Sequence, residues 1–562
     1  MDERRSRWHP GPPLIKGKPV TSGLVGAAAV VAILTLVSRV VGFGRVAVLG
    51  QTFGDSCVGT AYTTANAVPN VVFEVVVGGA LAGTVVPLLA GAARRRDDAK
   101  VAAVVRALTG WVLLLLVPAA LLCVAFAEPI VRFLLGDAPG CEQDALVSTT
   151  ASMLRVFAIQ IPIYGLTVIA QGTLHAHRRF VAPALAPLLS SLVVIAVLLA
   201  YQGISGDAGS LGALSTGALA LLSWGTTLGV LVLLLTQWPS MGQLRLLLVR
   251  PSLRFPAATG RPAVRLAAAG AVTVGAQWLA FVIGLRLAND HGDAGSALTF
   301  LLVWTVFLLP WAVLAFPIVT SVFPQLSALY ENDLPQEFAD TSATSLRAVV
   351  MAGALGAAGM VALASPLANV MLVGAPGVED TTGLRMALQA SAGAVFGYSL
   401  VGYLSRVLFA RHSTRSAALV AGGGWLLTTL AAVIVVPQVA DADVVIALAV
   451  CMSIGLLAAA VVALFLVESA AGRSALRGLP RAVGAALSAA VVAGGAGLLV
   501  TTIVESLWSV TVDSWGGALA AAALAGSVVV SIFALLVLLL DGDDLRTLWS
   551  AMRQRRAATS AE

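Results

Sequence analysis

Charged residues are scarce in this sequence, since only 11% of its 562 residues are Asp, Glu, Lys or Arg, whereas 59% are hydrophobic. An average soluble domain carries about 25% charged residues, and one soluble core could not bury this much apolar surface. The scarcity of charge therefore excludes a soluble globular protein and predicts a chain that lies in a lipid bilayer.

Cysteine is also rare, with four residues and no C-x-x-C pair. This excludes a dense disulfide framework and a zinc site built on paired cysteines. Cys123 and Cys451 fall inside apolar runs, whereas Cys57 and Cys141 fall between runs on the side predicted below to be external. An oxidising compartment would permit a bridge there, but the sequence does not give the Cα separation that a bridge needs. The pairing is an open alternative.

Catalytic motifs are absent as well. The sequence has no P-loop, nucleophile elbow or zinc motif, and its five histidines lack metal-ligand spacing. We therefore predict neither an enzyme nor a bound metal or cofactor. The formal net charge is +6, but the basic residues sit in short clusters between apolar runs. That pattern is typical of membrane topology and argues against nucleic-acid binding.

Long apolar runs fill most of the chain, and each is long enough to cross the roughly 30 Å hydrocarbon layer as a helix. Backbone polar groups in lipid must be paired internally, which Ala-, Leu- and Gly-rich runs achieve as helices. No small-residue cleavage site follows the first run, so it is predicted to be an uncleaved helix. The predicted spans are 23–43, 60–91, 101–127, 149–172, 180–201, 211–236, 264–288, 296–327, 344–371, 382–410, 416–437, 443–467, 482–503 and 516–540, with a break in the second near Pro69.

Basic residues test this topology, because they were not used to draw the spans. Of the 34 Lys and Arg residues, 27 fall in segments on the side of the amino terminus, while only Arg45, Arg132, Arg286 and Arg385 fall in loops on the other side. Positive charge favours the cytoplasmic side. The chain is therefore predicted to be a multi-pass protein of the cytoplasmic membrane with both termini inside.

Short strings recur between spans that are six apart, such as Val85-Val86-Pro87 and Val322-Phe323-Pro324. Because six is even, the two halves would have the same orientation and form a parallel repeat. The predicted fold class is therefore all-α, with about fourteen transmembrane helices in two six-helix lobes plus two carboxyl-terminal helices. The predicted domains are a tail 1–22, a first lobe 23–237, an interfacial linker 238–263, a second lobe 264–470, an appendage 471–541 and a tail 542–562.

Two arginines at the end of the first span are candidates for substrate binding. Arg39 and Arg45 lie six residues apart, and the guanidinium fork matches phosphate oxygens, so two of them facing a cavity would hold a pyrophosphate. The alternative is that both side chains reach out to external lipid headgroups. Spacing alone does not decide between these interpretations.

Polar residues in the second span form a further candidate site. Glu74 lies in an apolar stretch, and Asn70 and Asn66 lie one and two turns before it, respectively, on the same helix face. Glu74 would pair with Arg39 or Arg45, bind a cation, or carry a proton. For the two asparagines the alternative is a structural hydrogen bond between helices.

Four motifs follow one another near the start of the chain. They are Ser38-Arg39-Val40-Val41-Gly42-Phe43-Gly44-Arg45, Asn66-Ala67-Val68-Pro69-Asn70, Gly78-Gly79-Ala80-Leu81 and Val86-Pro87, in that order. Their order and spacing resemble the opening of MurJ/MviN lipid II flippases. The resemblance implies export of lipid II, the undecaprenyl-pyrophosphate-linked disaccharide peptide of peptidoglycan, by alternating access between two lobes. It implies that Arg39 and Arg45 grip the pyrophosphate. It also implies membrane lipids and the cell-wall synthesis machinery as partners.

The sequence departs from this family pattern at three positions. Thr60 stands where an acidic residue is common, and Phe73 and Thr305 stand where arginines are common. These departures leave open two alternative functions: the chain could export another polyprenyl-linked saccharide, or it could be a drug or cation antiporter of the same superfamily. A scaffold for cell-wall synthases is a third alternative.

Overall fold

The computed structural model describes residues 21–75, 82–205, 211–244, 246, 250–256, 260–507 and 514–540, and every regular element in these ranges is a helix. This confirms the all-α class. The predicted tails 1–22 and 542–562 fall almost entirely outside the described residues, as do the Gly78-Gly79-Ala80-Leu81 motif and parts of the 238–263 linker.

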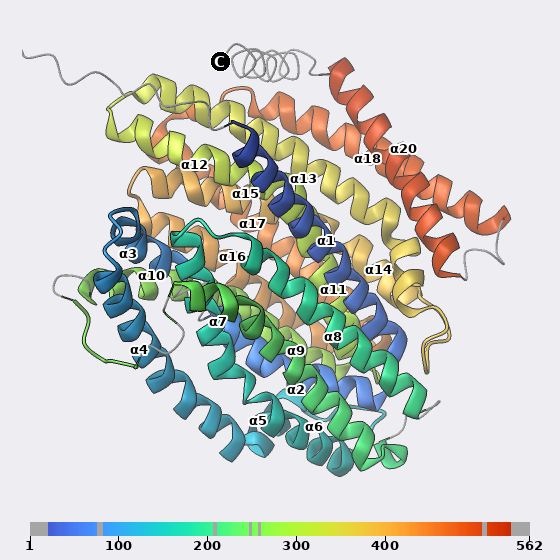
Figure 1. The fold of residues 1–562 in the computed structure, drawn as a ribbon. Coiled ribbons are helices and arrows are strands. Elements are labelled where there is room, and N and C mark those ends of the chain that lie inside the picture. The colour runs from blue at the N-terminus through green and yellow to red at the C-terminus, as the bar shows by residue number, and fades with distance from the viewer. Residues whose placement is uncertain are drawn as a thin grey trace, which may run out of the picture.

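The amino-terminal helices run from α1 to α9 (Figure 1). Their bounds are α1 (Thr21–Phe53), α2 (Cys57–Glu74), α3 (Ala82–Arg94), α4 (Asp98–Ala125), α5 (Ala127–Leu135), α6 (Gln143–Phe157), α7 (Gln160–Ala176), α8 (Val181–Ser205), the short η2 (Leu211–Ala213) and α9 (Thr216–Gln243).

The carboxyl-terminal helices run from α10 to α20. Their bounds are α10 (Gly260–His291), α11 (Ser296–Pro310), the π-helical η3 (Trp311–Ala315), α12 (Phe316–Glu331), α13 (Pro335–Leu372), α14 (Thr382–Ala390), α15 (Ala392–Ala410), α16 (Thr414–Val435), η4 (Val436–Gln438), η5 (Asp441–Asp443), α17 (Val444–Ala471), η6 (Arg473–Leu476), α18 (Leu479–Leu507) and α20 (Trp515–Leu540).

Twelve stretches of the described chain are long and apolar enough to cross a membrane, so the protein is a polytopic membrane protein. The two other predicted spans, 60–91 and 264–288, correspond to α2 with α3 and to α10. The first of these contains residues outside the described ranges, and side chains in the first part of the second are not described. The count of fourteen stays a prediction.

Two predicted helix limits were wrong. The first span was predicted to end at residue 43, but α1 continues to Phe53 because the apolar run resumes after Arg45 and residues 46–50 are buried against neighbouring helices. Arg45 therefore lies inside a helix rather than in a loop. The second span was predicted to break near Pro69, but α2 continues through that residue to Glu74. A proline removes one backbone hydrogen bond, but Pro69 and most of α2 before it are buried against neighbouring helices, and the helix continues through that loss.

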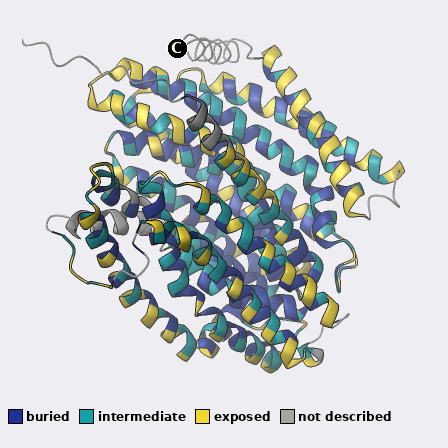
Figure 2. Cartoon of the chain, viewed as in Figure 1, coloured by how far each residue is buried: buried dark blue, intermediate teal, exposed yellow. Residues whose placement is uncertain are grey.

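The helices bury small side chains against one another and expose apolar ones on the outside. α1 packs on α8 and α8 on α9, while α13 packs on α15, α18 and α20. α18 and α20 lie at the edge of the bundle, where large side chains such as Val491 (75% exposed) and Leu539 (72% exposed) face outward (Figure 2). Exposed apolar residues in this density are expected where the solvent is lipid.

The molecule has two ends that matter for function. We call the end where α1 begins and α20 ends the terminal face; it is at the top of Figure 1. The other end, where α1 finishes and α5 and α6 lie, is called the opposite face.

The structure pairs Cys57 with Cys141 in a disulfide, with a Cα separation of 5.8 Å, which resolves the alternative that the sequence left open. The bridge ties the start of α2 to the loop before α6 at the opposite face. Cys123 and Cys451 are free. We therefore expect the denatured protein to react with two equivalents of a thiol reagent before reduction and with four after it. Four reactive thiols without reductant would contradict the bridge.

Candidate functional site

Arg39 and Arg45 both lie on α1, and both are exposed, but their surroundings differ. Six residues turn a helix by roughly 600°, so the two side chains leave it about 120° apart and about 9 Å along its axis. Arg39 lies near the middle of α1, among the exposed apolar side chains of Leu36 and Val40 (65% and 63% exposed). Arg45 is instead followed by five buried residues. The structure does not bring the two guanidinium groups together.

The polar residues of α2 share one face of the helix. Asn66, Asn70 and Glu74 are half-buried. The Tyr164 hydroxyl of α7 donates a hydrogen bond to Asn70 Oδ1 at 3.0 Å, and the Phe73 ring lies 4.3 Å from the Tyr164 ring between centroids. One predicted alternative, a hydrogen bond between helices, is therefore present at Asn70.

Arg45 and Glu74 both lie within electrostatic range of the Tyr164 hydroxyl, and Arg45 also lies within range of Tyr62. The described residues include no ion pair between Glu74 and either Arg39 or Arg45, so the pairing expected from the sequence is not made in this conformation. An arginine and a carboxylate that share a neighbourhood without pairing leave their hydrogen-bonding capacity available to a ligand.

The carboxyl-terminal helices contribute a second cation to the same region. Tyr398 of α15 donates a hydrogen bond to Gln277 Oε1 at 3.3 Å, and the charges of both Arg406 and Glu74 act on its hydroxyl. The Arg406 guanidinium is exposed and lies 5.5 Å from the centroid of the Phe323 ring. We call Arg45, Asn70, Glu74, Tyr164, Tyr398 and Arg406 the polar site.

Arg406 was missed in the sequence because it was counted among the basic residues that flank the spans. The signal was present, since it lies within the predicted span 382–410 and four residues before the end of α15. An arginine inside an apolar helix is costly and marks a candidate site.

Each of the three positions that depart from the family pattern makes a hydrogen bond or a ring contact within the protein. Thr60 is buried, and its Oγ1 accepts a hydrogen bond from the Gly295 N–H at 3.2 Å. Thr305 Oγ1 donates to the Leu301 carbonyl of its own helix at 2.8 Å. With Phe73 on Tyr164, each substitution is accommodated without an unpaired charge.

Residues 50–64 pack against residues 289–295 and 370–377 at the opposite face, and we call this contact the opposite-face seal. The Asp55 N–H donates to the Pro376 carbonyl at 2.9 Å. Asn289 Nδ2 donates to Thr64 Oγ1 at 3.0 Å, and Gln51 Nε2 donates to the Val370 carbonyl at 3.2 Å. Helices α1 and α2 are thus joined to α10, α11 and α13 at this face.

Asp55 makes the opposite-face seal sensitive to pH. Burial and, to a smaller extent, the nearby Asp293 and Asp380 carboxylates together raise the pKa of this carboxyl to about 6. A group whose pKa is raised in the sealed state favours sealing at low pH, and that contribution is lost as pH rises from about 4 to about 6. The full shift corresponds to at most about 3 kcal/mol.

We therefore expect the opposite-face seal to open increasingly between about pH 4 and pH 6 and to change little above. Spin labels at the exposed positions Ser148 and Glu379, in a Cys123→Ser and Cys451→Ser background, would report the distance across it. Asp55→Asn should remove this dependence, whereas Asp144→Asn, at an exposed carboxylate of the same face, should keep it. An unchanged pH profile in Asp55→Asn would refute the assignment.

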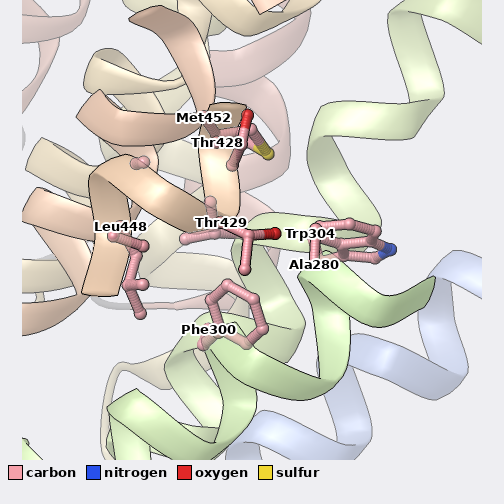
Figure 3. A pocket seen from close by; sticks show the side chains of 11 residues that line it. Ala280, Phe300, Trp304, Thr428, Thr429, Leu448 and Met452 are labelled. Atoms are coloured by element: carbon pink, nitrogen blue, oxygen red, sulfur yellow. The ribbon is translucent and has the colours of Figure 1, made fainter. Parts of the chain in front are cut away.

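A small cavity of about 20 Å³ lies in the core of the carboxyl-terminal helices between α10, α11, α16 and α17 (Figure 3). Phe300, Trp304 and Met452 line it, with the hydroxyls of Thr428 and Thr429 as polar groups. It has room for about one water, and no carboxylate lines it. It does not compete with Glu74 as a cation site.

Comparison with known proteins decides the family. The sequence profile described as "Lipid II flippase MurJ" matches residues 49–519. The chain belongs to the MurJ family. This match covers every residue of the polar site except Arg45, and it covers the opposite-face seal and all helices from α2 to α18.

Individual MurJ relatives match over shorter stretches. A "Probable lipid II flippase MurJ" of Synechocystis is 32% identical over 31% of this chain and 31% of its own length. One of Rhizobium meliloti is 29% identical over 49% of this chain and 50% of its own length. A "Lipid II flippase MurJ" of Burkholderia cenocepacia is 30% identical over 29% and 31%. The chain thus spans half or less of the length of the curated relatives it matches.

Solved structures share the fold over a greater length. A "Lipid II flippase MurJ, inward closed conformation" has a TM-score of 0.68 at 16% identity and covers 91% of this chain and 99% of that one. An inward-facing multidrug resistance MATE family transporter of the MOP superfamily has a TM-score of 0.62 at 13% identity and covers 80% and 98%. The fold is therefore that of the MurJ and MATE transporters.

Proposed function

We propose that this protein is a transporter that moves lipid II from the inner to the outer leaflet of the cytoplasmic membrane for cell-wall synthesis. The observation that carries the proposal is the match of the MurJ profile to residues 49–519. The polar site supports it, because Arg45 and Arg406 are exposed guanidinium groups without an ion pair among the described residues. Such groups suit a pyrophosphate.

We propose that the terminal face is cytoplasmic. Basic residues on that side far outnumber those on the other. The Cys57–Cys141 disulfide at the opposite face supports this orientation, because disulfides persist in an oxidising compartment. With fourteen spans, both termini would be inside the cell.

We also propose that residues 23–237 and 264–470 act as two lobes around the polar site, with 238–263 as their linker and 471–541 as an appendage. The opposite-face seal then closes the site to the outside. Alternating access would require it to part after lipid II has entered from the inner leaflet. Arg45 would receive the pyrophosphate, with Arg39 six residues earlier on the same helix.

The direction of transport follows from charge. Moving about two negative charges outward across an inside-negative potential of 100 mV releases roughly 4 to 5 kcal/mol, at about 2.3 kcal/mol per charge. The empty carrier would then return with a cation near Glu74. Flipping by Glu74→Gln that is unchanged in the absence of a cation gradient would exclude this role for Glu74.

The decisive experiment is the movement of fluorescent lipid II across liposomes that contain the purified protein. We expect transport of lipid II in preference to other polyprenyl-linked saccharides and to cationic drugs. Preferential transport of either alternative would replace the proposed substrate. A protein that moves none of them but binds cell-wall synthases would be a scaffold.

A further inference from the structure

A second cavity, of about 540 Å³, lies between α4, α7 and α9 and shares no residue with the polar site. Its walls are mostly apolar, with Leu113, Leu166, Ile169 and Leu234 among the side chains that form them. Arg250 is the charged residue in the lining. A volume of this size is in the range of pockets that hold a ligand of lipid or drug size.

The cavity lies in the half of the bilayer next to the terminal face. Val105 and Leu113 come 7 and 15 residues after the start of α4 at Asp98, which places them about 10 and 22 Å from that end. Trp238 and Met241 lie in the last two turns of α9, which ends at Gln243. A molecule that fills this space would extend from the headgroup level into the hydrocarbon.

One wall of the cavity is the segment 250–256, which leads from α9 toward α10 and which we call the strap. The Ser252 N–H donates to the Arg106 carbonyl at 3.0 Å, and Trp111 Nε1 donates to the Leu253 carbonyl at 3.1 Å. The strap approaches α4 closely because Gly110 has no side chain; a Cβ there would lie 2.7 Å from the Ser252 carbonyl carbon. The strap therefore lies fixed on α4 (Figure 1), and its residues Arg250 and Pro251 line the cavity.

Three arginines lie in the lining of the cavity or within three positions of a lining residue along the chain. Arg250 in the lining, Arg254 on the strap and Arg106 on α4 are all exposed. None of the three forms an ion pair with a carboxylate among the described residues. Basic pockets between transmembrane helices at the membrane surface suit anionic headgroups, and Trp111 and Trp238 are of the residue type enriched at headgroup level.

We propose that this cavity binds an anionic phospholipid of the leaflet at the terminal face, with one acyl chain between α4, α7 and α9 and the phosphate at Arg250. An acyl chain would pack against the apolar walls, and a negatively charged headgroup would pair with the arginines. Because the strap connects α9 to the start of α10, the lipid would hold this connection on α4. The site is separate from the one proposed for lipid II.

The test is lipid retention by the purified full-length protein. Phosphatidylglycerol and phosphatidylcholine with identical chains are titrated in turn, and native mass spectrometry counts the lipids bound. We expect one phosphatidylglycerol per protein, held about fivefold more tightly than phosphatidylcholine, since one basic contact at a membrane surface is worth about that factor. Arg250→Gln should remove this preference, and Thr109→Trp, which fills the cavity, should remove the bound lipid.

Matched control variants distinguish lipid binding in this cavity from the general effects of losing an arginine or adding a bulky side chain. Arg415→Gln removes an exposed arginine of α16, and Leu419→Trp adds bulk at a side chain of α16 that is 69% exposed; neither should change retention. Phosphatidylglycerol with brominated chains should quench Trp238, so that Trp238→Phe loses the quenched signal. This measurement locates the chain even if Thr109→Trp folds poorly.

Three results would overturn the proposal. One is equal retention of the two phospholipids by the wild-type protein. Another is unchanged retention in folded Thr109→Trp. The third is displacement of phosphatidylglycerol by undecaprenyl phosphate at a lower concentration than by phosphatidylglycerol itself, which would assign the cavity to a polyprenyl chain.

Discussion

Arg45→Ala is expected to reduce lipid II flipping by on the order of 100-fold. A hydrogen bond to a charged group contributes about 1.5–3 kcal/mol, and a forked guanidinium makes two of them to a pyrophosphate. Arg45 is exposed, has no ion pair among the described residues and shares the neighbourhood of Tyr164 with Glu74. Without Arg45, the pyrophosphate of the substrate would lose the arginine on α1 that is proposed to bind it. The rate of flipping in liposomes measures the effect.

Three further variants make this result specific. Arg45→Lys keeps the charge but not the fork, so we expect an intermediate rate. Arg132→Ala removes a half-exposed arginine that pairs with Glu128 on α5, and it should flip at the wild-type rate. We expect Arg39→Ala to lose less than Arg45→Ala, because Arg39 lies among exposed apolar side chains. Wild-type flipping by Arg45→Ala would remove this arginine from the polar site.

Gly50→Ala is expected to hold the opposite-face seal open. Gly50 lies in the part of α1 that touches α13, and a Cβ there would overlap the carbonyl oxygen of Met371. That atom belongs to the backbone and cannot rotate away. Overpacking of a close contact costs typically 1–3 kcal/mol, so the sealed state should lose about ten- to hundredfold in population. Flipping should fall with it, because the site would no longer be closed from outside.

An impermeant thiol reagent applied from the opposite face should then reach a cysteine introduced at Asn70. Gly42→Ala is the control within α1, since a Cβ at Gly42 meets nothing within 4 Å.

A second pair of variants tests the segment 370–377 of the opposite-face seal. Gly374 and Gly377 both have φ of +73°, but only at Gly377 would a Cβ meet a neighbour, the Asp55 carbonyl oxygen at 2.8 Å. Gly377→Ala should open the seal more than Gly374→Ala, and equal labelling of all four variants would contradict the proposed closure.

The sequence by itself determined the class and the membrane setting. Scarce charge and long apolar runs require helices in lipid, because backbone groups there must pair within each segment. The spacing of Asn66, Asn70 and Glu74 placed them on one helix face, and the motifs around Arg39 and Arg45 led to the MurJ family, which the match over residues 49–519 established.

Only the tertiary structure decided which polar groups meet. Arg45 and Arg406 lie 361 positions apart in the chain, and a hydropathy pattern does not predict which distant helices lie close together. The structure separated Arg45 from Arg39 by their surroundings, because helix rotation and burial, not spacing along the chain, set where a guanidinium points. It also paired Cys57 with Cys141 and assembled the opposite-face seal from three distant segments. Such contacts arise from close packing of whole helices, which no local pattern encodes.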